Sequence, residues 1–182
     1  ADRRRSLAVV SSPVRHNSGQ AEWYTPAEYV EAARTVLGGI DLDPASCSSA
    51  NEVVRAATFY DQRSDGLAQP WFGRVWMNPP YGANHMAAFC TRLVEAIKGG
   101  AVSAAIVLTN NATETRWFGD LAAAAAAVCF PAKRIRFWSE RGQASQPLQG
   151  QAFLYAGPDP DRFRAEFSRF GWTALIDRQP QR

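Results

Sequence analysis

The stretch Arg74-Val75-Trp76-Met77-Asn78-Pro79-Pro80-Tyr81 runs from a short apolar segment into a polar turn. Residues 74–77 predict a buried strand, because β-branched and aromatic residues are enriched in strands. Neither proline has a backbone N–H, so the pair must end the strand ladder. An asparagine and a tyrosine therefore stand at the end of a strand. In an open α/β sheet, ligands bind at that edge.

Strands and helices alternate on both sides of this turn. Thr25-Pro26 predicts a helix start, with Thr25 as N-cap and Glu28 completing a capping box. Gly38-Gly39 end that helix. Further helices are expected over 50–57, 86–98, 115–126 and 160–170, and further strands over 40–43, 102–108, 128–130, 135–138, 151–156 and 172–176. This order predicts an α/β fold with a mostly parallel sheet and an antiparallel C-terminal strand.

Length and composition predict one globular domain. The chain has 182 residues, of which 46% are apolar and 20% charged, which excludes a disordered or collagen-like chain. We expect a flexible basic arm over 1–20, the domain over 21–176 and a tail over 177–182. No apolar run approaches the roughly 20 residues of a membrane span, so no membrane association is expected. Three separated cysteines and no export signal indicate reduced thiols, and no metal-ligand spacing is present.

The net charge of +3 is unevenly distributed. Both ends of the chain are basic and the middle is acidic. Only Lys98 and Lys133 are lysines, and arginine is the cation suited to bidentate phosphate and base contacts. A GC-rich genome would give the same bias. Candidate phosphate contacts are Lys133, Arg134, Arg136 and Arg141; a solvated edge strand remains the alternative.

The turn after the central strand suits chemistry on a planar amine. The side-chain oxygen of Asn78 and the carbonyl of Pro79 are acceptors that can hold an –NH₂ group. Accepting both N–H bonds favours the pyramidal amine, whose lone pair is free to attack. Pro80 keeps the turn rigid, and Tyr81 offers a ring face on which a base can stack. The alternative is a rigid Pro-Pro loop with a surface tyrosine.

Asn78-Pro79-Pro80-Tyr81 after a strand resembles the catalytic motif of S-adenosylmethionine-dependent amino-methyltransferases, above all the bacteriophage-type DNA adenine-N6 methyltransferase family. The resemblance covers roughly residues 22–157, and its strength lies in the joint order of the motifs. The other motifs that carry it are Trp23-Tyr24-Thr25-Pro26, Asp41-Leu42-Asp43-Pro44-Ala45-Ser46, Asp65-Gly66-Leu67, Pro70-Trp71, Lys133-Arg134-Ile135-Arg136-Phe137 and the strand from Gln149 to Tyr155.

The resemblance implies a single Rossmann-like class I methyltransferase domain. Its cofactor would be S-adenosylmethionine and its partner double-stranded DNA, from which an adenine is flipped. It further implies a monomer or homodimer in the cytoplasm of a bacterial host, encoded by a phage or prophage. The implied catalytic residues are Asn78, Pro79, Pro80 and Tyr81. The implied cofactor-binding residues are Trp23, Thr25, Pro26, Asp41, Asp43, Pro44, Ala45, Asp65 and Asn78.

One segment departs from the family pattern. The cofactor loop usually carries Gly-x-Gly, which lets the backbone approach the ligand, but residues 46–49 contain no glycine. Asp61 and Asn51 are both candidates for holding the cofactor ribose, and Trp71 and Trp117 for stacking on a base.

Two other functions stay open. Methyltransferases that act on RNA guanine or on a protein glutamine amide share the Asn-Pro-Pro-Tyr motif. A non-catalytic DNA-binding module could keep the fold with a degenerate cofactor site.

Overall fold

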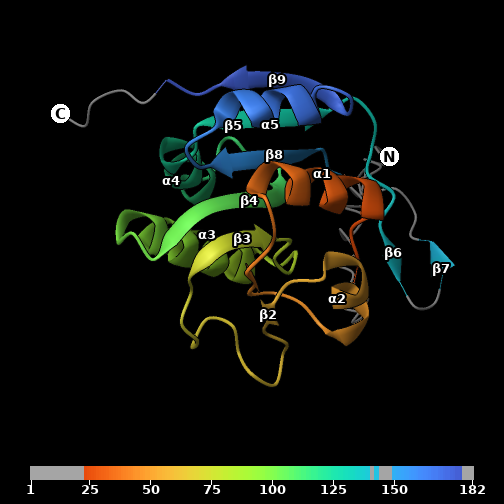
Figure 1. Ribbon diagram of the computed structural model, residues 1–182, viewed down its shortest axis with the longest axis vertical. Helices are drawn as coiled ribbons and strands as arrows, with labels where there is room; N and C mark the ends of the chain where they lie inside the picture. Colours follow the sequence, from red (N-terminus) through yellow and green to blue (C-terminus); the bar gives the residue numbers. More distant parts are fainter. Residues whose placement is uncertain (1–22, 140–141, 144–148, 178–182) are drawn as a thin grey trace, which may run out of the picture.

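The computed structural model describes residues 23–139, 142–143 and 149–177 (Figure 1). The predicted arm over 1–20, Arg141 and most of the predicted tail lie outside these residues. The described part contains five helices and nine strands. They are α1 Ala27–Leu37, β1 Leu42–Asp43, α2 Ser48–Val54, β2 Thr58–Phe59, β3 Gly73–Met77, α3 Ala83–Lys98, β4 Val102–Asn110, α4 Arg116–Ala124, β5 Ala127–Pro131, β6 Trp138–Ser139, β7 Gly142–Gln143, β8 Gln151–Ala156, α5 Pro160–Phe167 and β9 Gly171–Leu175.

Seven of the strands form one mixed sheet in the order β2-β1-β3-β4-β8-β5-β9. The pairings β2–β1, β1–β3 and β3–β4 are parallel. The pairings β4–β8, β8–β5 and β5–β9 are antiparallel. The mostly parallel sheet expected from the sequence is therefore not confirmed. β8 inserts between β4 and β5, and its reversed direction makes both of its pairings antiparallel.

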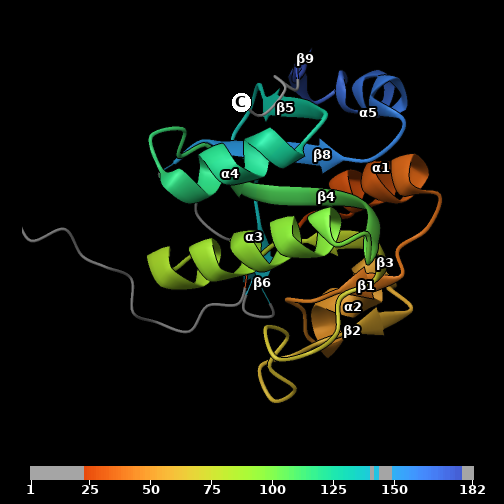
Figure 2. The same cartoon turned by 90° about the vertical axis from the view of Figure 1, so that its left-hand side faces the viewer.

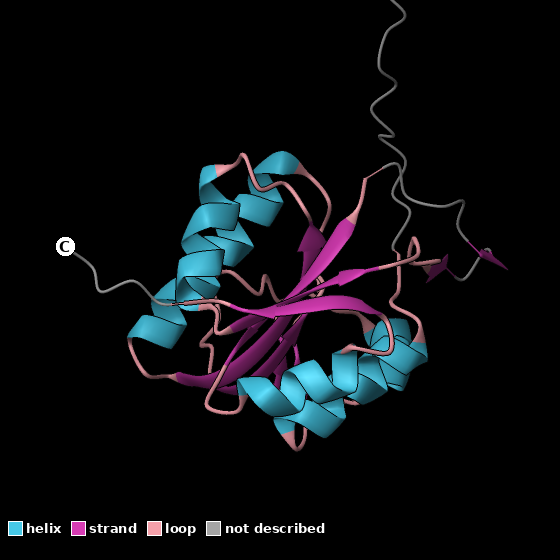
Figure 3. Ribbon diagram, turned by 90° about the horizontal axis from the view of Figure 1, so that it is seen from above, coloured by secondary structure: helices cyan, strands magenta, loops and turns pink. Residues whose placement is uncertain are grey.

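Helices cover both faces of the sheet (Figures 2 and 3). α1, α2 and α5 pack over Trp76, Ile106, Leu108, Phe153 and Tyr155 on one face. α3 and α4 pack over Val75, Met77, Val107, Ala152 and Leu154 on the other. Strands covered on both sides have to be apolar nearly throughout, and β4 and β8 are buried along almost their whole length. None of the described helices is long and apolar enough to cross a bilayer.

The start of α1 differs from the predicted capping box. Pro26 is the N-cap, with φ −56° and ψ 143°, and no side chain caps the helix. Thr25 lies one residue too early because Tyr24 makes an antiparallel bridge with Trp138, which keeps this segment extended. The hydroxyl of Thr25 is buried and has no hydrogen-bond partner among the described residues.

The predicted strand over 135–138 is also wrong. Only Trp138–Ser139 is a strand, and it pairs with β7 outside the main sheet. The alternation that suggested a strand is real: Ile135 and Phe137 are buried, while Arg134 and Arg136 are exposed. The segment places its two apolar side chains in the core cluster beneath α1 and α5. Packing, and not a strand ladder, therefore explains the alternation.

Candidate active site

The polar strand ends that the sequence singles out lie together at one edge of the sheet. β1 lies between β2 and β3 and is parallel to both. After β1 the chain forms β2 on one side of it, and then crosses back to form β3 on the other side. Such a point of reversal is where open α/β sheets bind ligands. Leu42 is in register with Val75. Because β1 and β3 are parallel, the Asp-Pro-Ala turn and the Asn-Pro-Pro turn leave the sheet at the same edge.

The carboxamide of Asn78 is held in one orientation. Its Nδ2 donates to the backbone carbonyl of Trp23 at 3.3 Å. Reversing the amide would set two oxygens against each other, so the contact fixes which atom is the oxygen. Oδ1 is buried and has no hydrogen-bond partner within the described part of the chain. Leaving a buried acceptor unpaired costs about 1–3 kcal/mol. The turn therefore presents one oriented acceptor.

Segment 23–25 is itself anchored by β6. Tyr24 and Trp138 exchange backbone hydrogen bonds of 2.8 and 3.0 Å. The Trp138 indole donates to the carbonyl of Thr25 at 3.3 Å, and the Tyr24 and Trp138 rings meet edge to face, with their centroids 4.7 Å apart. The chain before α1 thereby links Asn78 to the basic segment that precedes β6.

Asp43 is the buried carboxylate of the site. It ends β1 with 3% of its surface exposed. Its Oδ1 accepts from the Ala45 N–H at 3.2 Å, and the side chain of Ser46 also hydrogen-bonds to the carboxylate. Burial raises its pKa from 3.8 to about 7, because desolvation disfavours the charged form more than nearby hydrogen bonds favour it. A cation or N–H donor from a ligand would restore the carboxylate.

Asp41 has a different partner. Arg74 donates to it from Nε at 2.8 Å and Nη2 at 2.6 Å, and the Arg74 backbone N–H adds a third bond at 2.8 Å. These hydrogen bonds lower the pKa of Asp41. The close contact also requires glycine at position 73, where φ is +67° and a Cβ would lie 2.7 Å from Asp41 Oδ2. Asp41 thus ties β1 to β3, and its carboxylate is already satisfied.

A glycine from a distant segment packs closely on the Asp-Pro-Ala turn. Gly66 packs so tightly on the Asp-Pro-Ala turn that a Cβ there would lie 1.9 Å from the Pro44 carbonyl oxygen. The Trp71 indole donates to the Gly66 carbonyl at 2.7 Å and holds it in place. Asp65, just before it, is exposed with φ +51°, and its Oδ1 accepts from the Leu67 N–H at 3.2 Å.

Replacing Gly66 with alanine is expected to push the segment around residue 66 away from the Asp-Pro-Ala turn. The clash is with backbone, which cannot rotate away, and overpacking of this kind typically costs about 1–3 kcal/mol. We expect a lower midpoint of urea unfolding together with weaker cofactor binding. Gly119→Ala is the matched control, because a Cβ there meets nothing within 4 Å. A Gly66→Ala variant as stable as Gly119→Ala would contradict this packing.

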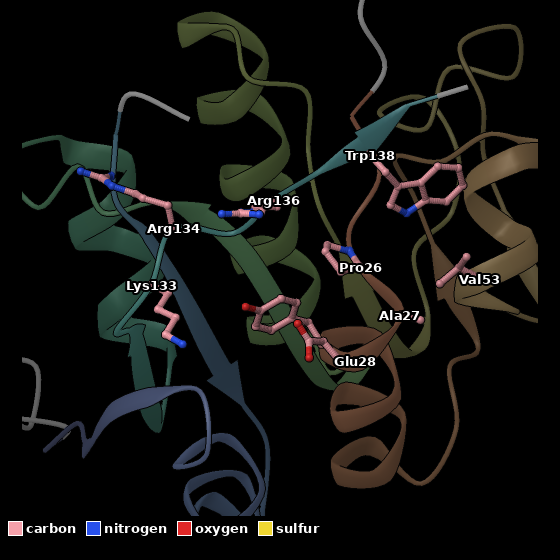
Figure 4. Close-up of a pocket in the computed structure, with 9 residues that line it drawn as sticks. Pro26, Ala27, Glu28, Val53, Lys133, Arg134, Arg136 and Trp138 are labelled. Atoms are coloured by element: carbon pink, nitrogen blue, oxygen red, sulfur yellow. The ribbon is translucent and has the colours of Figure 1, made fainter. Parts of the chain in front are cut away.

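The basic segment borders a pocket beside the start of α1. The pocket has a volume of about 820 Å³. Figure 4 shows Lys133, Arg134 and Arg136 on one side of it and Pro26, Ala27 and Val53 on the other. Asn78 and Asp43 do not line it. Tyr81, 39% exposed, meets the ring of Phe137 edge to face at 5.9 Å, so the basic segment also reaches the Asn-Pro-Pro-Tyr turn.

Three of the other candidates have structural roles. The amide of Asn51 exchanges hydrogen bonds with the backbone of Ala56 at the end of α2. Trp71 is 3% exposed and packs beside Phe89 in the core, so it is not available to stack on a base. Asp61 follows β2 at the same edge as Asp43, and its carboxylate accepts from the N–H groups of Arg63 and Ser64.

Sequence reasoning missed several site features. The Trp23 carbonyl that orients Asn78 belongs to the main chain and has no sequence signal. Phe137 belongs to a motif that the sequence shows, but nothing in the sequence indicated that its ring would meet Tyr81. Thr109 and Gln151 are 0% and 4% exposed, and each has a side-chain oxygen without a partner among the described residues. The available signal was a polar residue at the end of an apolar strand: Thr109 lies near the end of β4 and Gln151 begins β8.

Comparison with known protein families identifies a match over most of the chain. The model of the family described as DNA N-6-adenine-methyltransferase (Dam) matches residues 13–155, which include every strand end of the site. No curated protein matches the sequence. The chain belongs to the DNA N-6-adenine-methyltransferase (Dam) family.

Proposed function

We propose that this chain transfers a methyl group from S-adenosylmethionine to N6 of an adenine that has been flipped out of double-stranded DNA. The observation that carries the proposal is the buried, unpaired Oδ1 of Asn78, oriented by the Trp23 carbonyl. N6 of a paired adenine lies inside the duplex, so an enzyme that modifies it has to extrude the base. A Rossmann-like arrangement of the site at the β1–β3 reversal fits such a reaction.

Asn78 and Pro79 would act directly on the target amine. Each accepts a hydrogen bond from N6, through Oδ1 and the backbone carbonyl respectively, which favours the pyramidal amine with a free lone pair. As the N6–methyl bond forms and the sulfur–methyl bond breaks, positive charge would develop on N6 until it releases a proton to water, and the two fixed acceptor dipoles would stabilise that charge. Tyr81 and Phe137 border the same turn and offer aromatic surface to the base.

The residues at the end of β1 suit the cofactor. Asp43 is a buried carboxylate without a cationic partner in the described chain, and burial raises its pKa, so a donor from a ligand would stabilise its charged form. The cofactor's ammonium and adenine amino groups are such donors. Pro44, Ala45, Trp23, Thr25 and Pro26 complete the proposed binding surface, and Asp65 borders it. When bound, the cofactor supplies a methyl group already activated on sulfur, so orientation by the protein carries much of the catalysis.

Double-stranded DNA would lie along the basic segment. Lys133, Arg134 and Arg136 are exposed in a row, because Ile135 and Phe137 anchor the segment to the core. Phosphate contacts of this kind fix the register of the protein on the duplex. They lie next to the Tyr81 turn, where the extruded adenine would enter.

Labelled cofactor and separate pools of DNA, RNA and protein test the proposal. We expect the label in DNA, and N6-methyladenine after digestion to nucleosides. Label confined to RNA or protein would favour the rival amino-methyltransferases. No label anywhere, with no cofactor binding by calorimetry, would favour a non-catalytic DNA-binding module.

A further inference from the structure

A second polar cluster lies at the junction of β4 and β8. Asn110 ends β4 and is in register with Gln151, which begins β8. The Asn111 backbone N–H donates to the Gly150 carbonyl at 3.0 Å. The pocket formed here has a volume of about 150 Å³, and its lining is Asn110, Asn111, Ala112, Glu114, Gln149 and Gly150. β4 is parallel to β3, so this pocket shares the sheet edge of Asn78.

A buried acceptor adjoins this pocket. Gln151 is 4% exposed, and its Nε2 donates to the Gln149 carbonyl at 2.9 Å. Its Oε1 has no partner in the part of the chain that the structure describes. Two neighbours of Gln151 line the pocket: Gly150, which precedes it in the sequence, and Asn110, which pairs with it across the sheet. This repeats the arrangement of Asn78: one end of an amide is held by a carbonyl and the other is left free.

The chemistry of the lining indicates the ligand. Among the described residues, no lysine or arginine lines the pocket, and Glu114 contributes a carboxylate, so a phosphate is disfavoured. Amides both donate and accept, as base edges do, and carboxylates accept from the amino group of cytosine while asparagine and glutamine pair with adenine. The volume is below the roughly 300 Å³ at which small-molecule pockets begin. One base edge would fill it.

We propose that this pocket reads one base next to the target adenine, through the exocyclic amino group of an adenine or cytosine. The inference deepens the proposed function and rests on it. Asn111 and Glu114 would contact the base edge directly. Gly150 keeps Asn111 in place, because a Cβ at position 150 would lie 2.7 Å from the Asn111 Nδ2.

Methylation of a DNA library with random bases around each adenine tests this reading. The wild-type protein is expected to prefer an amino-bearing base at one flanking position. Glu114→Gln and Asn111→Ala should each weaken that preference by about tenfold, the effect of losing one good base contact. Gly150→Ala should also weaken the flanking-base preference, because the added Cβ would displace Asn111. Glu95→Gln is the control, because Glu95 is exposed near the far end of α3.

The outcomes separate this inference from the proposed function. A wild-type protein that methylates adenine, with flanking preferences unchanged in all three pocket variants, would overturn the base-reading pocket alone. A folded wild-type protein that binds DNA without methylating adenine would overturn the proposed function and the pocket's role with it. A preference lost in the pocket variants and kept in Glu95→Gln would support both.

Discussion

Replacing Asn78 with alanine is expected to reduce methyl transfer to DNA by at least about a hundredfold, because one fixed polar group facing developing charge is typically worth that much. The change removes the free Oδ1 acceptor and leaves the Pro79 carbonyl as the only oxygen on the amine. The contact with the Trp23 carbonyl is lost as well. Single-turnover transfer of a tritiated methyl group measures the effect.

Measuring cofactor affinity shows whether the Asn78→Ala change slows methyl transfer itself or weakens cofactor binding. We expect the Kd for S-adenosylmethionine to change only modestly, because the proposed cofactor surface lies mainly at the end of β1. Asn84→Ala is the matched control: Asn84 is exposed on the first turn of α3, close in sequence to the same turn. Methyl transfer by Asn78→Ala near the wild-type rate would rule out Asn78 as the residue that holds the amine.

Replacing Asp43 with asparagine is expected to raise the stability of the ligand-free protein above neutral pH and to weaken cofactor binding. The folded protein keeps the Asp43 proton up to about pH 7, whereas the unfolded chain releases it near pH 3.8. The folded state binds more protons between these values, so the free energy of unfolding of the ligand-free protein falls as pH rises through that window. Each pKa unit corresponds to about 1.4 kcal/mol. The side chain in Asp43→Asn cannot ionise, so the free energy of unfolding of this variant should not fall with pH in this way.

Urea unfolding between pH 4 and pH 8 measures the first effect. At pH 8 the ligand-free Asp43→Asn protein should be more stable than wild type. Its cofactor affinity should fall by about tenfold to a hundredfold, the value of hydrogen bonds to a charged group. Asp41→Asn is the contrasting variant: it weakens the ion pair with Arg74, so it should lower stability at neutral pH and leave cofactor affinity nearly unchanged. An Asp43→Asn protein that binds the cofactor like wild type would show that Asp43 does not hold it.

Local patterns account for what could be predicted from the sequence. The strand over 74–77 and the turn after it are both present, because an apolar run followed by two prolines leaves the backbone few alternatives. The strand over 151–156 is present with the same bounds. The two-residue strand β2 was not predicted, since Thr58–Phe59 is too short to show a period and is defined by its pairing with β1.

Long-range contacts account for the rest of the site. Asp41 and Asp43 look equivalent in the sequence, but Arg74 satisfies one while burial isolates the other. The glycine that touches the Asp-Pro-Ala turn comes from position 66 and not from the adjoining loop, because the chain folds back there.

The alternation of strands and helices, the Asn-Pro-Pro-Tyr turn at a strand end and the basic segment after β5 follow from local sequence, because side-chain periodicity and proline act locally. The mixed sheet, the orientation of Asn78 by the Trp23 carbonyl and the approach of Gly66 to Pro44 follow from the folded arrangement. Strand direction, backbone carbonyls and close packing depend on which distant segments meet, and a backbone carbonyl is the same chemical group at every position of the chain.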